Sequence, residues 1–155
     1  MQLTRLLISS LALYFSPITH AVSFVDCGSK SVATRSVKIS PCFSDPCTLF
    51  VGDSVTIEVT FIAGADIVPG VFRLQSRIGG KLLEKIFLDD TVCTHFSPMC
   101  PIRSGGTYTY RFKGVVTQTT SNKLINGRLE LANPKGKAFL CAEFGMRILD
   151  SNTNA

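Results

Sequence analysis

Apolar and polar residues alternate along much of this chain, with a period of two residues instead of the 3.6 residues of a helix. The alternation is clearest in Val32–Ile39 and Ser54–Phe61, which are also rich in the β-branched residues that favour strands. Further segments with the composition of strands are Val71–Ile78, Leu82–Leu88, Thr107–Phe112, Leu124–Leu131 and Ala138–Leu149. The pattern therefore predicts about seven short strands.

Turn-forming residues separate the predicted strands, for example at Gly52-Asp53 and Pro69-Gly70. No long segment has helical periodicity. Short strands at this spacing indicate an all-β fold in which two antiparallel sheets pack face to face as a sandwich. Side chains of both inner faces normally fill such an interior. The period of two does not distinguish a filled interior from one that holds a cavity.

The first 21 residues differ from the rest of the chain. Arg5 precedes a mostly apolar run, Leu6–Phe15, and Thr19 and Ala21 are small residues close to a cleavage point. This three-part pattern predicts a secretory signal peptide, residues 1–21, cleaved near Ala21. We expect residues 22–155 to form one soluble domain, because no later run reaches the roughly 18 apolar residues of a membrane span. The expected destination is the extracellular space or the lysosomal lumen.

All six cysteines follow the predicted signal peptide: Cys27, Cys42, Cys47, Cys93, Cys100 and Cys141. An even number of cysteines on an oxidising route indicates three disulfides. The count alone leaves the pairing open. Two short segments that contain proline, 42–47 and 93–100, can close local loops, which would leave the first and last cysteines to join the ends of the domain. A zinc site is less favoured, because no pair has C-x2-C spacing and only His95 could add an imidazole.

The chain offers little that enzyme chemistry requires. His95 is the only histidine after the signal peptide, and no nucleophile elbow, Walker A, HExxH or EF-hand motif occurs. The net charge is +5, but the basic residues are scattered and are not interleaved with stacking aromatic residues, as nucleic-acid binding would require. We therefore expect no catalytic residue, no metal, no cofactor and no nucleic-acid partner.

The cysteines and their neighbours resemble a known family. The similarity is carried by Asp26–Ser29, Val37–Cys42, Pro46-Cys47, Gly52, Val55–Phe61, Cys100–Ile102, Thr107–Tyr110 and Leu140-Cys141. In these segments the chain resembles the ML (MD-2-related lipid-recognition) family, and within it the Niemann-Pick type C cholesterol-binding branch and the group 2 mite allergens. The resemblance implies an immunoglobulin-like sandwich with a lipid cavity between splayed sheets. It also implies the disulfides Cys27–Cys141, Cys42–Cys47 and Cys93–Cys100.

The resemblance also indicates where a lipid would enter. For the sterol-binding branch it implies a tunnel mouth near Leu83–Leu88 and Val115-Val116. Val115 and Val116 occupy a Pro-Val position of that branch and retain the Val but not the Pro, and Thr120 stands where the branch has an aromatic residue. The candidate lipid-binding residues, each of which could instead be ordinary core, are Phe72, Leu74, Ile78, Phe87, Tyr110, Phe112, Val116, Leu129 and Phe144.

The hypothesis that follows is a secreted or lumenal protein that binds and transfers a small apolar lipid, such as a sterol or fatty acid, as a monomer. Transient contact with a membrane or a receptor would accompany transfer. The alternative is an immune recognition module of the MD-2 type or an allergen-like interaction module, in which bound lipid changes a surface that docks on a receptor. A sandwich with a filled core and a purely structural role would have no cavity.

Overall fold

The computed structural model describes residues 20–78, 81–88, 92–117 and 120–150. They form eleven strands and one 3₁₀ helix, η1 (Val92–His95). The strands are β1 (His20–Val22), β2 (Phe24–Asp26), β3 (Val32–Ser40), β4 (Cys47–Phe50), β5 (Ser54–Ala63), β6 (Val71–Ile78), β7 (Lys81–Leu88), β8 (Phe96–Ser97), β9 (Thr107–Val115), β10 (Ile125–Ala132) and β11 (Ala138–Leu149). The seven predicted strands are confirmed as β3, β5, β6, β7, β9, β10 and β11.

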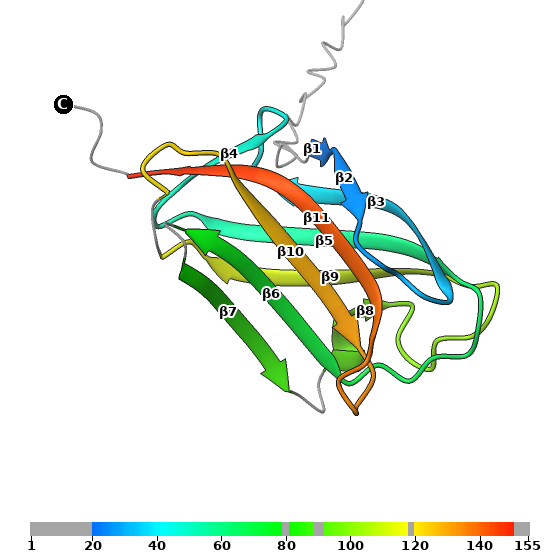
Figure 1. The fold of residues 1–155 in the computed structure, drawn as a ribbon. Coiled ribbons are helices and arrows are strands. Elements are labelled where there is room, and N and C mark those ends of the chain that lie inside the picture. The colour runs from blue at the N-terminus through cyan, green and yellow to red at the C-terminus, as the bar shows by residue number, and fades with distance from the viewer. Residues whose placement is uncertain (1–19, 79–80, 89–91, 118–119, 151–155) are drawn as a thin grey trace, which may run out of the picture.

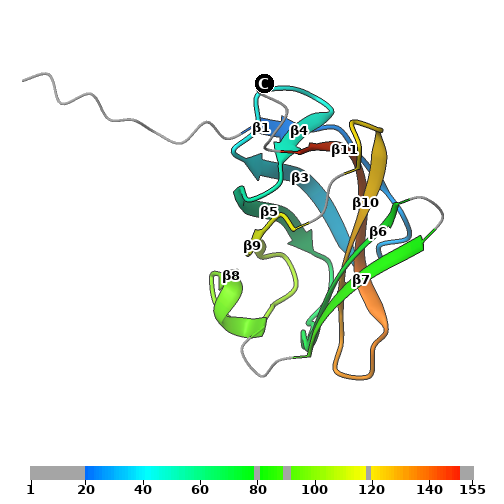
Figure 2. The same ribbon diagram turned by 90° about the vertical axis from the view of Figure 1, so that its left-hand side faces the viewer.

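The strands form two sheets that face each other (Figures 1 and 2). The first sheet has the order β1-β3-β5-β9-β8, and the second has the order β2-β11-β10-β6-β7. Neighbours along both orders are antiparallel. The added strand β4 runs parallel to the end of β11, with Met146 opposite Cys47. The predicted sandwich of two antiparallel sheets is confirmed, with β4 as the one parallel pairing among the described strands.

β5 lies at the centre of the first sheet and alternates between buried and half-buried residues. Val55, Ile57, Val59, Phe61 and Ala63 are all buried, whereas the residues between them face outward and are half-buried. Because successive side chains of a strand point to opposite faces, the five apolar residues all face the second sheet. Partners on both sides, β3 and β9, complete the backbone hydrogen bonding of β5.

Three disulfides hold the sandwich together, and their pairing is the expected one. Cys27–Cys141 joins the start of the domain to β11 across 114 residues, with the two Cα atoms 5.0 Å apart. A loop of this length limits the unfolded chain by about 4 to 5 kcal/mol on the entropic account. Cys42–Cys47 and Cys93–Cys100 close loops of 5 and 7 residues, beside β4 and around η1 and β8.

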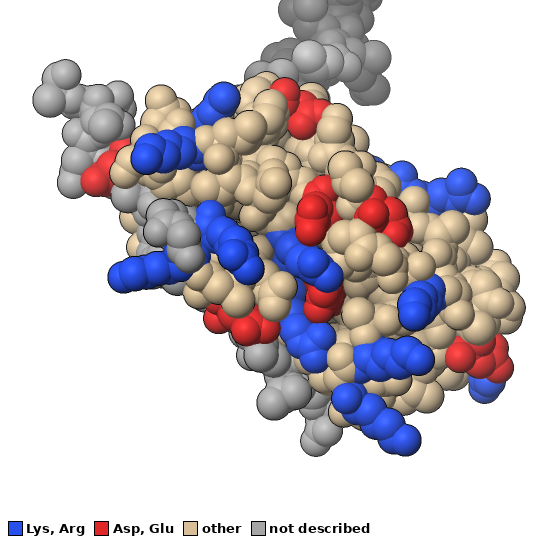
Figure 3. Space-filling model, viewed as in Figure 1, with Lys and Arg blue, Asp and Glu red and all other residues tan. Residues whose placement is uncertain are grey.

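Charged side chains of both signs are scattered over the outer face of the second sheet (Figure 3). Glu130 is 8% exposed and is shared by Arg73, at 3.1 Å, and Arg128, at 2.8 Å. Arg128 also lies 3.6 Å from Glu143. Since a nearly buried carboxylate needs such partners, these arginines serve the structure of the sheet.

Candidate lipid-binding cavity

A cavity of about 300 Å³ lies between the two sheets. The first sheet contributes Ile39, Val55 and Ile57 to its wall, and the second contributes Leu74, Met146 and Ile148. Leu49 of β4 lines it as well. The wall is therefore mainly aliphatic and comes from strands far apart in the sequence.

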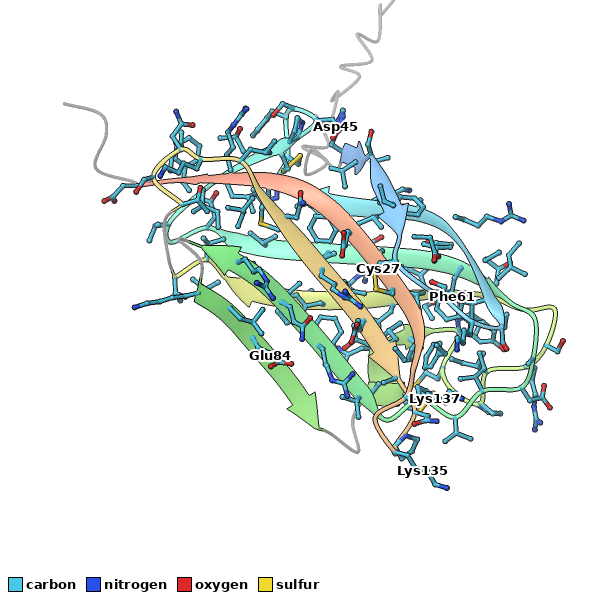
Figure 4. The ribbon with its side chains drawn as sticks, in the orientation of Figure 1. Cys27, Asp45, Phe61, Glu84, Lys135 and Lys137 are labelled. Carbon is cyan, nitrogen blue, oxygen red and sulfur yellow. A yellow bond between two sulfur atoms is a disulfide. The ribbon has the colours of Figure 1, made fainter. Side chains whose placement is uncertain are left out.

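Polar residues lie at the edge of the cavity, on β6 and β7. Gln75, Ser76 and Glu84 line it there, and Gln75 Nε2 donates a hydrogen bond of 2.9 Å to Glu84 Oε1. Glu84 marks this edge on β7 in Figure 4. The cavity thus combines an apolar wall with a few polar groups at its border, as is usual for sites that bind small apolar molecules.

An aromatic stack separates the cavity from the rest of the interior. The ring of Phe72 on β6 stacks on Phe112 of β9, at 5.0 Å between centroids, and on Tyr110 of β9, at 5.1 Å. Beyond the stack, Phe61 packs against Phe96, Tyr108 and Phe139 with centroids 6.0 to 6.3 Å apart. Aromatic rings therefore fill one part of the sandwich, and the hollow part is aliphatic.

Glycine positions the Phe112 ring at this border. A Cβ atom added to Gly114 would lie 2.8 Å from Cζ of Phe112. Because real Cβ atoms do not approach another carbon so closely, only glycine lets the ring take this place. Gly114 lines the cavity itself and lies opposite Val55 in the register of β5 and β9.

The structure brings some of the sequence-predicted residues together at the cavity and not others. Leu74, Phe112 and Val116 line it. Phe72, Leu129 and Phe144 are at most 2% exposed and belong to the packed core, and the buried Tyr110 faces a separate hollow beside β9. The side chains of Ile78 and Phe87 lie outside the described residues. Whether any of these residues binds a lipid stays a prediction.

Sequence reasoning missed most of the aliphatic wall, namely Ile39, Leu49, Val55, Ile57, Met146 and Ile148. Several of the predicted residues are aromatic, and among these Phe72 and Phe144 fill the core while Phe112 forms the border. A signal was present, because the alternation of β3 and β5 places Ile39, Val55 and Ile57 on the inward face. It does not reveal which stretch of that face meets side chains of the other sheet.

β4, β9 and β11 finish, and β7 and β10 begin, at the same end of the sandwich (Figure 1). Large apolar residues at these strand ends are exposed. Phe50, Leu82, Val115 and Leu124 are 43 to 54% exposed. Val115 also lines the cavity, so this end is its mouth. We call these four residues the apolar rim.

Thr120, which stands where the sterol-binding branch has an aromatic residue, holds a turn beside the mouth. Its Oγ1 accepts a hydrogen bond of 2.9 Å from the Ile148 backbone N–H and donates one of 2.8 Å to the Lys123 carbonyl. The side chain is 3% exposed. Thr120 therefore fixes the link before β10 against β11, the strand that carries Met146 and Ile148.

Within the described part of the chain, no group of three or more His, Cys, Asp or Glu side chains is placed to hold a metal ion. Among the same residues, no helix is long and apolar enough to cross a membrane.

Comparison with known proteins places this geometry in a family. A model of the ML domain matches residues 21–148. The NPC intracellular cholesterol transporter 2 of Danio rerio is 31% identical over 130 residues, which cover 83% of this chain and 86% of that protein. The mite group 2 allergen Lep d 2 of Lepidoglyphus destructor is 23% identical over 115 residues, which cover 74% and 79%.

A solved structure shows the same fold. The Niemann-Pick type C2 protein from Japanese carpenter ant superimposes with a TM-score of 0.66 at 19% identity, covering 82% of this chain and 99% of that one. The match to the ML domain, residues 21–148, includes all six cysteines of the chain. The chain belongs to the ML domain family.

Proposed function

We propose that this protein carries one small apolar lipid, a sterol or a fatty acid, between its sheets. The observation that carries the proposal is the aliphatic cavity of about 300 Å³ that ends at the apolar rim. Small-molecule pockets range from roughly 300 to 1,000 Å³, so this cavity suits one ligand of modest size.

The energetics favour an apolar ligand. Transfer of apolar surface from water into such a space contributes about 25 cal/mol per Å². The few polar groups at the edge, Gln75, Ser76 and Glu84, could accept or donate a hydrogen bond to a single polar end of the ligand. An apolar lipid therefore matches the wall better than a polar metabolite, which would leave its hydrogen bonds unmade inside.

The relatives support a lipid and make a sterol one candidate. The Danio rerio relative is an NPC intracellular cholesterol transporter 2. At 31% identity the two proteins share the family, while Val115 and Thr120 differ from the pattern of the sterol-binding branch at the mouth. A fatty acid is the other candidate, because an aliphatic wall accommodates an acyl chain as readily as a sterol ring system.

The protein acts outside the cytosol, as a monomer, in this proposal. Cleavage of residues 1–21 would release it into the secretory route, towards the extracellular space or the lysosomal lumen. Three disulfides support that route, since they persist in oxidising compartments. The apolar rim would make brief contact with a membrane or a receptor when lipid enters or leaves.

The apolar rim also favours one alternative. Exposed apolar groups around a ligand mouth can form part of a protein interface. In that case the protein would be a recognition module of the MD-2 type or an allergen-like interaction module, and the bound lipid would complete its docking surface. A stable complex with a receptor ectodomain, formed only when lipid is bound, would favour this alternative over the carrier.

Two measurements on the purified mature protein test the proposal. Extraction followed by mass spectrometry identifies any lipid that copurifies, and titration with dehydroergosterol and with a fluorescent fatty acid gives dissociation constants. We expect one lipid per protein and binding below about 10 µM, which corresponds to roughly 7 kcal/mol. Absence of both copurified and added lipid would contradict the proposal.

A further inference from the structure

A second hollow lies beside the cavity, along one edge of β9. It has a volume of about 580 Å³ and is lined by η1, β8, β9 and Glu58 of β5. β8 pairs only with Thr109 and Tyr110 of β9. Among the described residues, no strand lies beside Arg111–Val115 on that edge. We call this hollow the β9 groove.

The β9 groove adjoins the cavity at Phe112, which lines both. Side chains of both faces of β9 contribute to the groove, because Tyr110 and Phe112 face the interior while Arg111 and Lys113 face outward. The groove therefore passes around the edge of the strand, from the aromatic border of the cavity to the outer face of the first sheet. A ligand that occupies the cavity could extend one end past Phe112 into it.

Among the described residues, the charges that line the β9 groove leave one cation without an ion-pair partner. Arg111 is held by Glu58, whose Oε1 accepts a hydrogen bond of 3.0 Å from Nε of the guanidinium and lies 3.0 Å from Nη2. These two charges neutralise each other. Lys113 is exposed and makes no ion pair with any residue that the structure describes. Its ammonium gives the groove a net positive charge.

We propose that the β9 groove binds the carboxylate of a long-chain fatty acid whose acyl chain occupies the cavity, with Lys113 as the cation that the carboxylate meets. The inference rests on the proposed carrier function and specifies its ligand. An apolar chamber next to a groove with an unpaired ammonium matches an amphiphile with one acidic end. A sterol has no charge and would form no ion pair with Lys113.

The size of the expected effect follows from the exposure of Lys113. An ion pair between exposed groups is worth up to about 1 kcal/mol, and a groove that excludes part of the water raises this value. Removal of the ammonium should therefore weaken fatty-acid binding roughly 3- to 10-fold. The effect should shrink at high salt, because ions screen a partly exposed pair.

A comparison of charged and neutral ligands tests the inference. Titration calorimetry would measure binding of palmitate and of the uncharged hexadecanol to the mature wild type, to Lys113→Met and to Lys135→Met. Lys135 is a matched control, because it is an exposed lysine in the β10–β11 turn of the other sheet (Figure 4). We expect Lys113→Met to bind palmitate roughly 3- to 10-fold more weakly than the wild type and to bind hexadecanol with an affinity within about 2-fold of the wild type. Lys135→Met should change neither affinity.

The possible results distinguish failure of the carboxylate site from failure of the proposed carrier function. If Lys113→Met weakens both ligands equally, or weakens neither, the carboxylate site is wrong and the carrier function stands. If the wild type binds a sterol but no fatty acid, the carboxylate site is wrong and the carrier function stands with a sterol as its ligand. If the wild type binds palmitate, hexadecanol and sterol no better than buffer, the proposed function fails together with the inference.

Discussion

The ring of Phe112 lies against the ring of Phe72, with centroids 5.0 Å apart and planes 23° apart. One residue belongs to the first sheet and the other to the second, so the contact joins the two layers. Phe112 also lines both the cavity and the β9 groove. This pair therefore determines where packed interior ends and hollow interior begins.

Truncation of Phe112 should enlarge the cavity at a cost in stability. Loss of a large core ring costs about 3 to 5 kcal/mol, and less where the ring is only half-buried, so we expect roughly 2 to 3 kcal/mol for Phe112→Ala. Urea unfolding measures this loss. The variant should also bind lipids bulkier than those the wild type accepts. Unchanged stability together with an unchanged ligand range would show that the ring does not border the hollow.

A large side chain placed inside the cavity should block lipid binding. Val55 lines the cavity, so a phenyl ring at Val55→Phe can extend into the hollow. We expect at least a 10-fold loss of affinity with a change in stability below about 1.5 kcal/mol, because the ring fills existing space.

Val25→Phe supplies the control for Val55→Phe. Val25 is 67% exposed on β2, and the same enlargement there should leave lipid binding unaltered. Equal losses in the two variants would mean that added phenyl groups disturb the protein generally and that Val55→Phe reports nothing about the cavity.

Gly127→Ala should affect binding more than stability. A Cβ atom at Gly127 would lie 2.5 Å from Cε of Met146, the flexible end of a cavity-lining side chain. We expect Met146 to move towards the empty space, which lowers affinity several-fold while the free energy of unfolding changes by less than about 1 kcal/mol. Binding titration and urea unfolding give the two quantities. Met146→Ala in the same chain should restore part of the affinity.

Asp66 should make stability depend on acid pH. The Ser104 backbone N–H, with Arg103 nearby, lowers the pKa of Asp66 below its ordinary value of 3.8. A carboxyl whose pKa is lower in the folded state stabilises the fold above its unfolded pKa, and this contribution is lost as the pH falls through the folded pKa. The stability difference between wild type and Asp66→Asn should therefore shrink in acid, as measured by urea unfolding over a pH series. A difference that is constant with pH would contradict this role.

The sequence predicted the long strands from two signals, the alternation of apolar and polar residues and a composition typical of strands. Ser54–Phe61 lies within β5 and Ala138–Leu149 coincides with β11. The strands of two to four residues, β1, β2, β4 and β8, were not predicted. They are too short to show a period. They form because the tertiary structure places them beside a partner strand, as where Cys47 of β4 lies opposite Met146 of β11.

The candidate site was predicted less completely than the fold. Family resemblance placed an apolar space between the sheets, and Val116 and Phe112 were predicted near it. Alternation indicates that Ile39, Ile57 and Ile148 face inward, but an inward residue can meet either a neighbour or a void. That choice depends on side chains of the opposite sheet, such as Phe72, which fills its own region and leaves the aliphatic one hollow.

The most direct test of the central claim is a crystal structure of the mature protein with a bound brominated fatty acid. An anomalous difference map would locate the bromine atom. We expect one bromine peak between the sheets, among Ile57, Met146 and Ile148, which line the cavity from both layers. Continuous side-chain density across that space, with bromine only on the outer surface, would contradict the claim that the sheets enclose a lipid.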